Sequence, residues 1–346
     1  MSTYSVEIHR YSLIPVSAPN SRSTANVRHG CLLRFGFNSQ SRTQEHVSPE
    51  VGYADCFPWP ELGDEPLEKQ LDSLRTGLLT PITERSLFFA WHDAVARSAG
   101  VSLFKDLEIP PSHFLVTDLA GLNESTIHSQ SKLGFRLFKL KVGKNPKTEA
   151  SIIRRFTSDF ESEKMKLRLD FNSSLNPETL NQFLDDLGEA AGLIDFLEDP
   201  IPFDPRAWAS LERDWKIRLA LDRINPSKLE QTLRQIPGSG VSVIVIKPAS
   251  QDPTPLINAA KKNAASLVFT SSMDHPLGQL CAAWCAGMAA TQGTRMIEPG
   301  GLLSQSSYLD HPWHDAIQSA GPHLIIPSGP GFGLDHRLEK LRWERV

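Results

Sequence analysis

The chain has 346 residues, of which 40% are hydrophobic and 22% are charged, and its 40 acidic and 36 basic side chains give a formal net charge of −4. This composition is typical of a globular protein with two domains, or with one barrel and an addition, and the lack of a basic excess argues against a nucleic-acid partner. No apolar run approaches the roughly 20 residues of a membrane span, and the first residues, MSTYSVEIHR, lack the apolar core of a signal peptide. We expect a cytoplasmic protein with neither a nucleic-acid nor a membrane partner.

The N-terminal part of the chain predicts an α+β domain over residues 1–110. Its expected elements are antiparallel strands within 5–57 and two helices, near 65–78 and 83–99. A polar, Ser-bearing segment inside the strand region is expected to form a mobile loop. The Gly/Pro-rich end of the chain, residues 325–346, is expected to return to this domain and pack on it.

A different rhythm begins beyond residue 110 and predicts a second domain over residues 111–324. Five apolar, strand-like runs each end in a charged side chain and are followed by Asn-Pro or Asp-Pro; they are FRLFKLKV, KLRLDFN, LIDFLED, IRLALD and VSVIVIK. Asn and Asp cap the free N–H groups of a starting helix, and proline fits the first helical position. The pattern therefore predicts strand followed by helix five times. Further strands are expected at 114–120, at 266–272 and, shorter, near 295–303.

This alternation predicts an α/β fold with a parallel sheet, which is either a closed barrel or an open, doubly wound sheet. An open sheet binds its ligand at one switch point, usually beside a Gly-rich turn, and no G-x-G-x-x-G motif follows a strand in this sequence. The charges instead follow five successive strands, and only a barrel gathers such positions around one pocket. We therefore predict a modified TIM barrel, (β/α)7β, with the N-terminal α+β domain as its cap.

The charged residues at the strand ends form a set suited to metal-dependent chemistry. Lys139 and Lys141 lie two residues apart, so their side chains share one face of the strand, which is the barrel interior if the apolar face meets the outer helices. Asp170, Glu198 and Asp222 end the next three strands. Three carboxylates are hard oxygen ligands suited to Mg²⁺, with Mn²⁺ as a substitute, and no His or Cys joins them to favour zinc.

Lysines flank these acids on both sides, because Lys247 ends the strand that follows Asp222. A nearby dication and a second lysine both disfavour the ammonium form, so one of the lysines is suited to act as a base near neutral pH. A base that faces a metal fits removal of a proton α to a carboxylate, with the metal stabilising the enediolate. The alternative is that these charged residues merely lie in solvent at the ends of the strands. That explanation suits a single pair of charges better than it suits the whole set.

The motifs KLK, LDFN, LEDP, ALD and IKP, in this order and spacing, resemble the muconate-lactonizing subgroup of the enolase superfamily. A lysine base with Mg²⁺ is the known pattern of that superfamily. Within the subgroup, the segments VGYADCFPWPEL, TSSMDHPLG and GPGFGLD make the chain similar to the o-succinylbenzoate synthase family of menaquinone biosynthesis. The resemblance spans most of the chain and is strongest between Phe135 and Gly278.

The resemblance implies a reaction and a role for each lysine. The reaction is a Mg²⁺-dependent syn dehydration of 2-succinyl-6-hydroxy-2,4-cyclohexadiene-1-carboxylate, a small carboxylate substrate, to o-succinylbenzoate. Lys141 would remove the α-proton and then assist loss of hydroxide. Lys139 would help to neutralise the substrate carboxylate, and Lys247 would stabilise the enolate from the opposite face.

The resemblance also implies a metal site and a substrate contact. The metal ligands would be Asp170, Glu198 and Asp222, supported by Asn172 and Asp199. Ser272 would contact the succinyl chain, and the polar loop around Ser21–Arg28 would cover the site.

Several positions depart from the family pattern. Asp55 stands where a Glu is usual, and Arg223 follows Asp222 where a second acid is common. A Glu-Ser-Ser run is replaced by Asp274, His275 and Pro276. The stretch MIEPGGLLSQ, where the last strand is expected, matches poorly, which leaves the exact substrate open.

Other interpretations use the same residues differently. Within the fold, a muconate cycloisomerase, a dipeptide epimerase or an N-succinylamino acid racemase would use the same acids and lysines; a dipeptide epimerase usually shows an Asp-x-Asp motif near the last strand, and none is present. A Schiff-base aldolase with Lys247 as nucleophile, or a non-catalytic binding scaffold, leaves the three acids unexplained. The sequence contains no coiled-coil repeat, so it does not indicate the oligomeric state.

The remaining chemistry-bearing residues receive structural interpretations. Cys281 and Cys285 lie one helical turn apart and are expected to be buried, reduced core residues. Trp59, between two prolines, is expected to pack at the interface of the two domains. Four histidines lack the spacing of metal ligands and are expected at the surface or in loops: His275, His311, His314 and His323.

Overall fold

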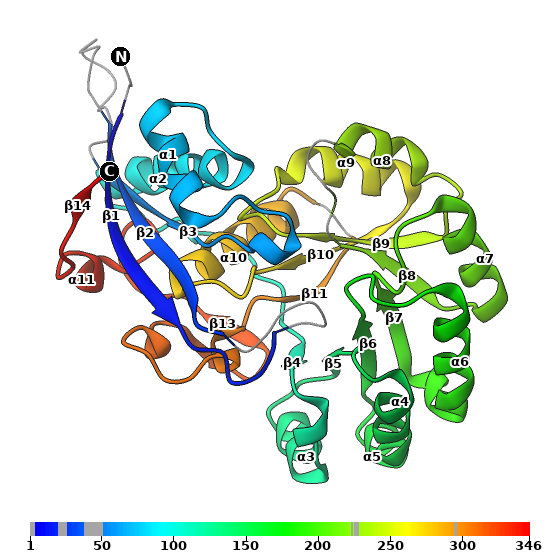
Figure 1. Cartoon of the computed structure of the whole chain (residues 1–346). Helices are drawn as coiled ribbons and strands as arrows, with labels where there is room; N and C mark the ends of the chain where they lie inside the picture. Colours follow the sequence, from blue (N-terminus) through cyan, green and yellow to red (C-terminus); the bar gives the residue numbers. More distant parts are fainter. Residues whose placement is uncertain (1–3, 20–25, 38–50, 223, 225–227, 294–295) are drawn as a thin grey trace.

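The computed structural model describes residues 4–19, 26–37, 51–222, 224, 228–293 and 296–346, and these form a small antiparallel sheet with two helices beside a parallel barrel (Figure 1). The barrel helices lie on the outside of the barrel. Helix α10 lies between the barrel and the N-terminal sheet, where it contacts strand β3.

Within the described residues, eight parallel strands form the barrel in the order in which they occur along the chain. They are β4 (Phe114–Val116), β5 (Leu137–Lys141), β6 (Lys166–Asp170), β7 (Ile194–Glu198), β8 (Arg218–Leu221), β9 (Val241–Ile246), β10 (Ser266–Thr270) and β11 (Ile297–Gly301). The helices between them are α3 (Glu124–Lys132), α4 (Pro146–Arg155), α5 (Thr157–Ser162), α6 (Pro177–Leu187), α7 (Pro205–Trp215), α8 (Leu229–Gln235), α9 (Pro253–Asn263) and α10 (Pro276–Thr291). The predicted (β/α)7β barrel is confirmed. Strand β4 is shorter than expected because Asp118 caps a 3-10 turn directly after it.

The helix starts follow the predicted capping pattern with one exception. Helices α6, α7 and α9 are each capped by the side chain that precedes their first proline: Asn176, Asp204 and Asp252. Asn145 does not cap α4 with its side chain. Instead, Glu149 reaches back from the first turn and accepts hydrogen bonds from three backbone N–H groups, because its two oxygens serve more donors than one amide oxygen. The dipeptide Asn225-Pro226 lies outside the described residues.

The barrel closes where the segment before β4 meets β11. The N–H of His113 donates to the carbonyl oxygen of Gly300 at 2.8 Å, and the N–H of Gly300 donates to that of Pro111 at 2.9 Å. Glycine is required at position 300, because a Cβ there would lie 2.1 Å from the carbonyl oxygen of Phe269. This closure brings the charged strand ends around one axis.

The register of the barrel strands sets the level of each interior side chain. Lys141 pairs with Asp170, and Asp170 pairs with Glu198, so these three residues lie at one level of the barrel. Lys139 lies opposite Arg168 one level below, since side chains on the same face of a strand are two residues apart. Along β7 to β10 the interior beneath the charged ends is filled by buried apolar side chains: Phe196, Ala220, Val243, Val245 and Val268.

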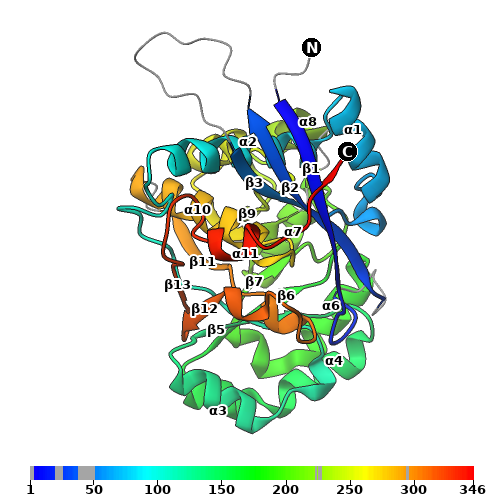
Figure 2. The same ribbon diagram turned by 90° about the vertical axis from the view of Figure 1, so that its left-hand side faces the viewer.

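The N-terminal sheet and the end of the chain form the cap. Its strands are β1 (Tyr4–Leu13), β2 (Arg28–Phe37), β3 (Val51–Cys56) and β14 (Glu344–Arg345), and its helices are α1 (Leu67–Thr76) and α2 (Pro81–Ser98). Neighbouring strands are antiparallel, and β14 pairs with β1, so the end of the chain lies beside its start in Figures 1 and 2. The predicted α+β organisation is confirmed, whereas the boundary at residue 110 stays a prediction. Two short strands and a short helix lie between β11 and β14: β12 (Gln318–Ala320), β13 (His323–Ile325) and α11 (Asp335–Leu338).

A buried pair of carboxyl groups joins the cap to the barrel. Asp55 in β3 accepts hydrogen bonds from the hydroxyl of Tyr11 at 2.7 Å and from the N–H of His275 at 3.2 Å. Asp274, after β10, lies beside it, because a Cβ added to Gly278 would lie within 2.7 Å of both carboxyl groups. Burial raises the pKa of Asp274 to about 7, and burial together with Asp274 raises the pKa of Asp55 well above its ordinary value. The two acids therefore share at least one proton near neutral pH.

His275 lies in the loop between β10 and α10, one of the two places expected for it, but it is buried there. Its ring packs between Tyr11 and Trp313, with each pair of ring centroids 4.7 Å apart. Its Nδ1 accepts a hydrogen bond from the N–H of Leu277, which makes His275 the cap of α10. That capping role explains the burial of His275, and the spacing of the histidines along the sequence gives no sign of it. Cys281 and Cys285 are buried and unpaired, as predicted.

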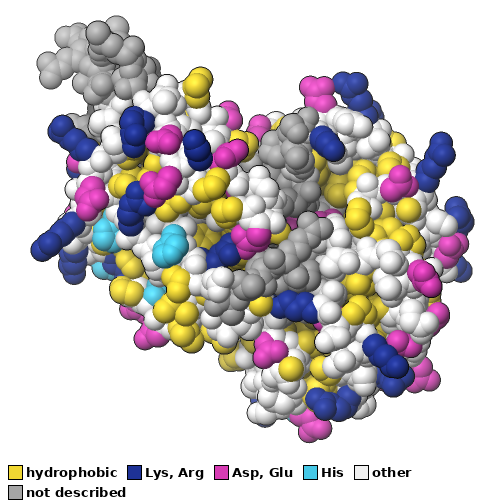
Figure 3. All heavy atoms as spheres, viewed as in Figure 1, with side chains coloured by type: hydrophobic (Ala, Val, Ile, Leu, Met, Phe, Trp, Pro, Cys, Tyr) yellow, Lys and Arg dark blue, Asp and Glu magenta, His cyan; other side chains and the backbone are white. Residues whose placement is uncertain are grey.

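The outer surface carries mixed charge. On the face shown in Figure 3, basic and acidic side chains lie interspersed over both the cap and the barrel. Among the described helices, none combines the length and apolar character needed to cross a membrane.

We expect the substitution Asp274→Asn to change how stability depends on pH. The unfolded chain releases the Asp274 proton near pH 4, whereas the folded chain holds it up to about pH 7. Wild-type stability therefore falls between these two pH values, by up to about 1.4 kcal/mol per pH unit for one proton. Urea unfolding between pH 4 and 8 should show the variant gaining stability relative to the wild type as pH rises.

Asp55, whose pKa burial and Asp274 also raise, titrates in the same sense, but it is present in both proteins, so the comparison of the variant with the wild type reports on Asp274. Other neighbouring groups do not reproduce this effect near neutral pH. Burial raises the pKa of Tyr11 and Cys281 and lowers that of His275, so all three stay neutral there. The exposed Asp214 supplies the control, Asp214→Asn. A stability difference between Asp274→Asn and the wild type that stays constant across the pH range would contradict the shared proton.

Candidate active site

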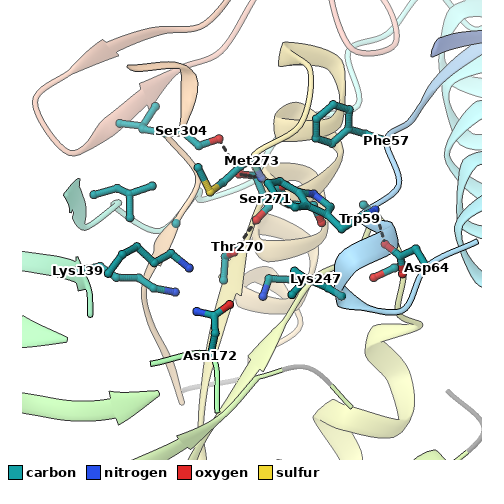
Figure 4. A pocket seen from close by; sticks show the side chains of 18 of the residues that line it. Phe57, Trp59, Asp64, Lys139, Asn172, Lys247, Thr270, Ser271, Met273 and Ser304 are labelled. Atoms are coloured by element: carbon teal, nitrogen blue, oxygen red, sulfur yellow. Dashed lines mark hydrogen bonds between the residues drawn. The ribbon is translucent and has the colours of Figure 1, made fainter. Parts of the chain in front are cut away.

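A pocket lies where the cap meets the C-terminal ends of the barrel strands (Figure 4). The cap contributes apolar side chains and one acid: Phe57, Trp59, Leu62, Ile82 and Asp64. The barrel contributes five of the residues predicted from the sequence: Lys139, Lys141, Asn172, Lys247 and Ser272. Figure 4 shows Lys139 and Lys247 reaching toward the pocket from opposite sides, with Asn172 between them.

Lys139 and Lys141 both bind the acids of the neighbouring strands. The Nζ atom of Lys139 lies 2.8 Å from Asp170 Oδ2 and 2.7 Å from Glu198 Oε2. The Nζ atom of Lys141 lies 2.6 Å from Asp170 Oδ2. The adjacent pairing of β5, β6 and β7 makes these contacts possible, since it places the side chains at neighbouring levels of one ladder. Both lysines thus point inward, as the alternation of the strand predicts.

Lys247 and Asp222 form a second ion pair on the other side of the pocket. Asp222 follows the last residue of β8, and Lys247 follows β9 directly, so parallel neighbouring strands place their ends together. Asp222 is buried, and its Oδ1 atom has no hydrogen-bond partner among the residues that the structure describes. An unsatisfied buried carboxylate oxygen of this kind indicates room for a missing cationic or hydrogen-bonding group.

Tight turns after β6 and β7 place the two supporting residues. Asn172 and Asp199 have φ values of 51° and 42°, in the left-handed region that Asn and Asp tolerate better than most residues. The side chain of Asn172 donates to Asp170, and Asp199 Oδ1 accepts from the N–H of Asp222 at 3.1 Å. Each therefore contacts one of the predicted metal ligands.

The environment moves the pKa values of the two inner lysines in opposite directions. Burial lowers the pKa of Lys141, and Lys139 adds to this effect while Asp170 opposes it. Burial also disfavours the ammonium form of Lys139, but Asp170 and Glu198 outweigh it, so the pKa of Lys139 lies above its ordinary value. Lys141 is therefore the lysine suited to lose its proton and act as a base, and Lys139 is suited to remain a cation.

The acids respond to the same burial. Their lysine neighbours offset burial and hold the pKa values of Asp170 and Asp222 below the ordinary range. Burial, with Asp170 as a neighbouring negative charge, raises the pKa of Glu198 to about 8. Burial and the nearby Asp222 raise the pKa of Asp199 to about 7. The cluster thus carries more acidic groups than its lysines can fully stabilise as anions.

The chemistry of this cluster fits a divalent cation. Asp170, Glu198 and Asp222 are oxygen donors on three adjacent strands, and the unpartnered Oδ1 of Asp222 is one free coordination position. Among the described residues, however, no three acidic, His or Cys side chains converge closely enough to form a preassembled metal cage. The lysine ammonium groups hold the carboxylates instead. A metal that binds these residues would compete with the lysines for the carboxylate oxygens.

The sequence did not reveal several residues of the pocket floor and wall. His113 lines the pocket from the segment before β4, and its ring lies 3.4 Å from the guanidinium of buried Arg168. Arg168 also binds Asp195 and Glu298, at 2.8 Å and 3.1 Å, across the barrel interior. Burial, with Arg168 nearby, lowers the pKa of His113 well below its usual value, so the ring is neutral. Arg168 and Asp170 lie two residues apart on β6, so the same period-two alternation predicts that Arg168 also points into the barrel.

The seam between cap and barrel forms the opposite wall. The indole N–H of Trp59 donates to the carbonyl oxygen of Ser272 at 2.9 Å, which places Trp59 at the interface, as expected. Ser271 and Ser304 share a hydrogen bond of 2.9 Å beside the pocket. Two predicted features cannot be compared: Arg223 and most of the loop that begins at Ser21 lie outside the described residues.

Comparisons of the sequence with known families and proteins find several matches. A family model described as O-succinylbenzoate synthase, N-terminal domain, matches residues 6–96, and one described as Enolase C-terminal domain-like matches residues 124–340. An o-succinylbenzoate synthase from Bdellovibrio bacteriovorus is 31% identical over 339 residues, which cover 97% of this chain and 97% of that protein.

Solved structures of other enzymes share the fold. A 2-chloromuconate cycloisomerase from Rhodococcus opacus matches with a TM-score of 0.77 and 16% identity over 100% of both chains. An N-succinyl Arg/Lys racemase from Bacillus cereus matches with a TM-score of 0.76 and 16% identity over 99% of both chains. A dipeptide epimerase from Enterococcus faecalis, complexed with Mg and a dipeptide, matches with a TM-score of 0.74 and 15% identity, over 96% of this chain and 99% of that one. At these identities the likeness concerns the fold alone.

We expect Asp222→Asn to weaken Mg²⁺ binding by about 10-fold or more, because it removes one anionic oxygen donor from the cluster. Isothermal titration of the purified protein with MgCl₂ measures the change. Asp64→Asn is the matched control, since Asp64 lines the same pocket from the cap side. Equal Mg²⁺ affinity in the wild type and in Asp222→Asn would remove Asp222 from the ligand set.

Proposed function

Since the chain belongs to the o-succinylbenzoate synthase family of the enolase superfamily, we propose that it dehydrates 2-succinyl-6-hydroxy-2,4-cyclohexadiene-1-carboxylate to o-succinylbenzoate in menaquinone biosynthesis. Membership of this family makes the protein an enzyme of the lyase class. The observation that carries the proposed mechanism is the placement of Lys141 and Lys247 on either side of the three buried carboxylates. We also place the reaction in the cytoplasm, since all four cysteines are unpaired.

Lys141 would act first as a base and then as an acid. In its neutral form, its Nζ atom takes the proton from the carbon α to the ring carboxylate. The electron pair of that C–H bond first moves toward the carboxylate and gives an enediolate anion. It then forms the new ring double bond as the C–O bond to the neighbouring hydroxyl breaks. The same Nζ returns its proton to the departing hydroxide, so water leaves and Lys141 is neutral again. The lowered pKa of Lys141 supports this cycle near neutral pH.

The remaining charged residues would stabilise the anion formed when the proton leaves. Asp170, Glu198 and Asp222 would hold Mg²⁺, which when bound supplies positive charge to the carboxylate of the substrate. Lys139 stays protonated and adds a second positive charge on the same side. Asn172 would orient the carboxyl group of Asp170 through its side-chain hydrogen bond, and Asp199 would hold the backbone of Asp222. The charges would therefore be in position before the proton transfer begins.

Lys247 would serve the opposite face of the substrate ring. It enters the pocket from β9, across from Lys139, and it is paired with Asp222. An ammonium there would stabilise the delocalised negative charge without taking part in proton transfer. A single acid–base lysine matches a syn elimination, in which the proton and the hydroxide leave from one face.

The walls of the pocket support a carboxylate substrate without an ammonium group. Strand β11 and the residues after it contribute Gly301, Leu303 and Ser304, none of which is acidic. Apolar side chains from the cap, including Phe57 and Trp59, suit a ring. Ser272 lines the pocket and is available to the succinyl chain. These features favour the dehydratase over a dipeptide epimerase.

A second activity is supported by the same two lysines. With Lys141 and Lys247 on opposite sides, one can remove an α-proton and the other can return it to the opposite face, which is racemisation of an N-succinylamino acid. A cycloisomerase would need the same base. Incubation with an N-succinylamino acid in D₂O tests the racemase, because exchange of the α-proton is visible by NMR.

We expect Mg²⁺-dependent conversion of the cyclohexadiene substrate, followed by its ultraviolet absorbance, and a loss of about 10³-fold or more in kcat for Lys141→Ala. Mg²⁺ binding should persist in this variant, because the carboxylates remain. Lys144→Ala is the control, since Lys144 is an exposed lysine three residues further along. EDTA should inactivate the wild type, and added Mg²⁺ should restore it.

Two outcomes would overturn parts of the proposal. Turnover by Lys141→Ala close to that of Lys144→Ala would exclude Lys141 as the base. Absence of dehydration by the Mg²⁺-bound wild type, together with α-proton exchange on an N-succinylamino acid, would replace the dehydratase by the racemase.

A further inference from the structure

Helix α2 of the cap reaches the backbone beside Lys247 through one buried side chain. The Nε–H of Arg85 donates to the carbonyl oxygen of Pro248 at 3.0 Å, and Arg85 is only 7% exposed. Pro248 is the residue directly after Lys247. We propose that Arg85 is a positioning residue, which fixes the turn after β9 so that the Lys247 ammonium meets the substrate at the right place. This inference rests on the role proposed for Lys247.

The turn after β9 is held from within by its own residues. The carbonyl oxygen of Lys247 accepts from the N–H groups of Ser250 and Gln251, at 3.1 Å and 3.0 Å. The N–H of Lys247 donates to the side chain of Gln251 at 2.8 Å. These bonds fix the shape of the turn, but both partners of each bond lie within the turn. The bond from Arg85 ties it to the other domain, and so sets where the turn lies relative to the cap wall of the pocket.

An open cavity lies beside this turn, so the turn is not packed against protein on that side. A second cavity, of about 430 Å³, is bounded by Arg85, Phe88, Ser250, Gln251 and other residues. Ser250 also lines the active-site pocket, so the turn lies between the two cavities. Close packing normally fixes a backbone segment from both sides, and the side of the turn that faces this cavity lacks such packing. A shift of the turn toward this cavity would move Lys247 away from the pocket.

The surroundings of Arg85 indicate a role other than maximal stability. Its guanidinium lies over the ring of Phe88, 4.2 Å from the ring centroid, and 5.0 Å from that of Phe89. Its buried Nη2 atom has no hydrogen-bond partner within the described part of the chain. Leaving a buried polar group unsatisfied is unfavourable, and an apolar side chain of similar volume often fits such a place at least as well. The bond that Arg85 makes to Pro248 gives an arginine in this position a role that an apolar side chain could not fill.

The test compares Arg85→Met with Arg85→Lys in the full-length, Mg²⁺-bound enzyme. Methionine keeps the buried stem but removes the donor, so kcat should fall by about 10- to 100-fold while KM changes little, since a displacement of about 1 Å can cost two orders of magnitude in rate. Lysine keeps one donor and should restore part of the loss. Glu84→Gln is the matched control, because Glu84 is the exposed neighbour on α2 and borders the same cavity.

A second measurement does not depend on turnover. Mild acetylation followed by mass spectrometry gives the reactivity of Lys247 relative to that of Lys141 in the same molecule. Arg85→Met should change this ratio, whereas a general loosening of the cap would change both lysines together. Thermal unfolding checks that the variants are folded, and Arg85→Gln replaces Arg85→Met if the latter is not.

The outcomes separate this inference from the proposed function. An altered Lys247 ratio with an inactive wild type would support the positioning role and reject the dehydratase. An active wild type, with unchanged kcat or an unchanged ratio in Arg85→Met, would overturn the positioning role and leave the dehydratase standing.

Discussion

The active-site geometry depends on the mutual neutralisation of buried lysines and carboxylates at the ends of five neighbouring strands. A charge removed from water costs several kcal/mol unless a partner compensates it. Lys139 compensates the carboxylates of two neighbouring strands, because it contacts both Asp170 and Glu198. Lys247 and Asp222 do the same on the other side. The arrangement supplies three anionic groups for a cation and keeps Lys139, Lys141 and Lys247 within reach of one substrate.

These contacts exist only because the barrel strands are in register and the ring is closed. One residue of slip between β5 and β6 would turn Lys141 or Asp170 toward the helices. The ladder pairs them directly, and the closure at Gly300 holds the first and last strands together. Further down the interior, Arg168 of β6 binds Asp195 of β7 and Glu298 of β11, so these contacts join three strands. Ionic contacts thus fix the barrel at two levels, and the upper one is the site.

Much of this could be predicted from the sequence because the decisive features are local. Period-two alternation places Lys139 and Lys141 on one face, and the strand ends at Asp170 and Glu198 are visible as apolar runs that stop at a charge. Features that depend on distant residues were missed. His275 is buried through contacts with Tyr11 and Trp313, and His113 is brought under the pocket by barrel closure. At Asn145, competition from Glu149 decided the cap, and propensity alone does not rank the two.

The cap does more than cover the pocket, because it binds backbone atoms on both sides of it. Trp59 donates to the carbonyl oxygen of Ser272, and Asp55 accepts from the N–H of His275, so the loop after β10 is tied to the cap at two points. Arg85 ties the loop after β9 through Pro248. Loops at the C-terminal ends of barrel strands carry the catalytic groups but pack less tightly than the strands themselves. Ties from a separate domain limit their movement, and they also make the position of Lys247 sensitive to how the cap sits. Substrate contacts in the cap can therefore be coupled to catalysis in the barrel without any residue of the cap touching the reacting atoms.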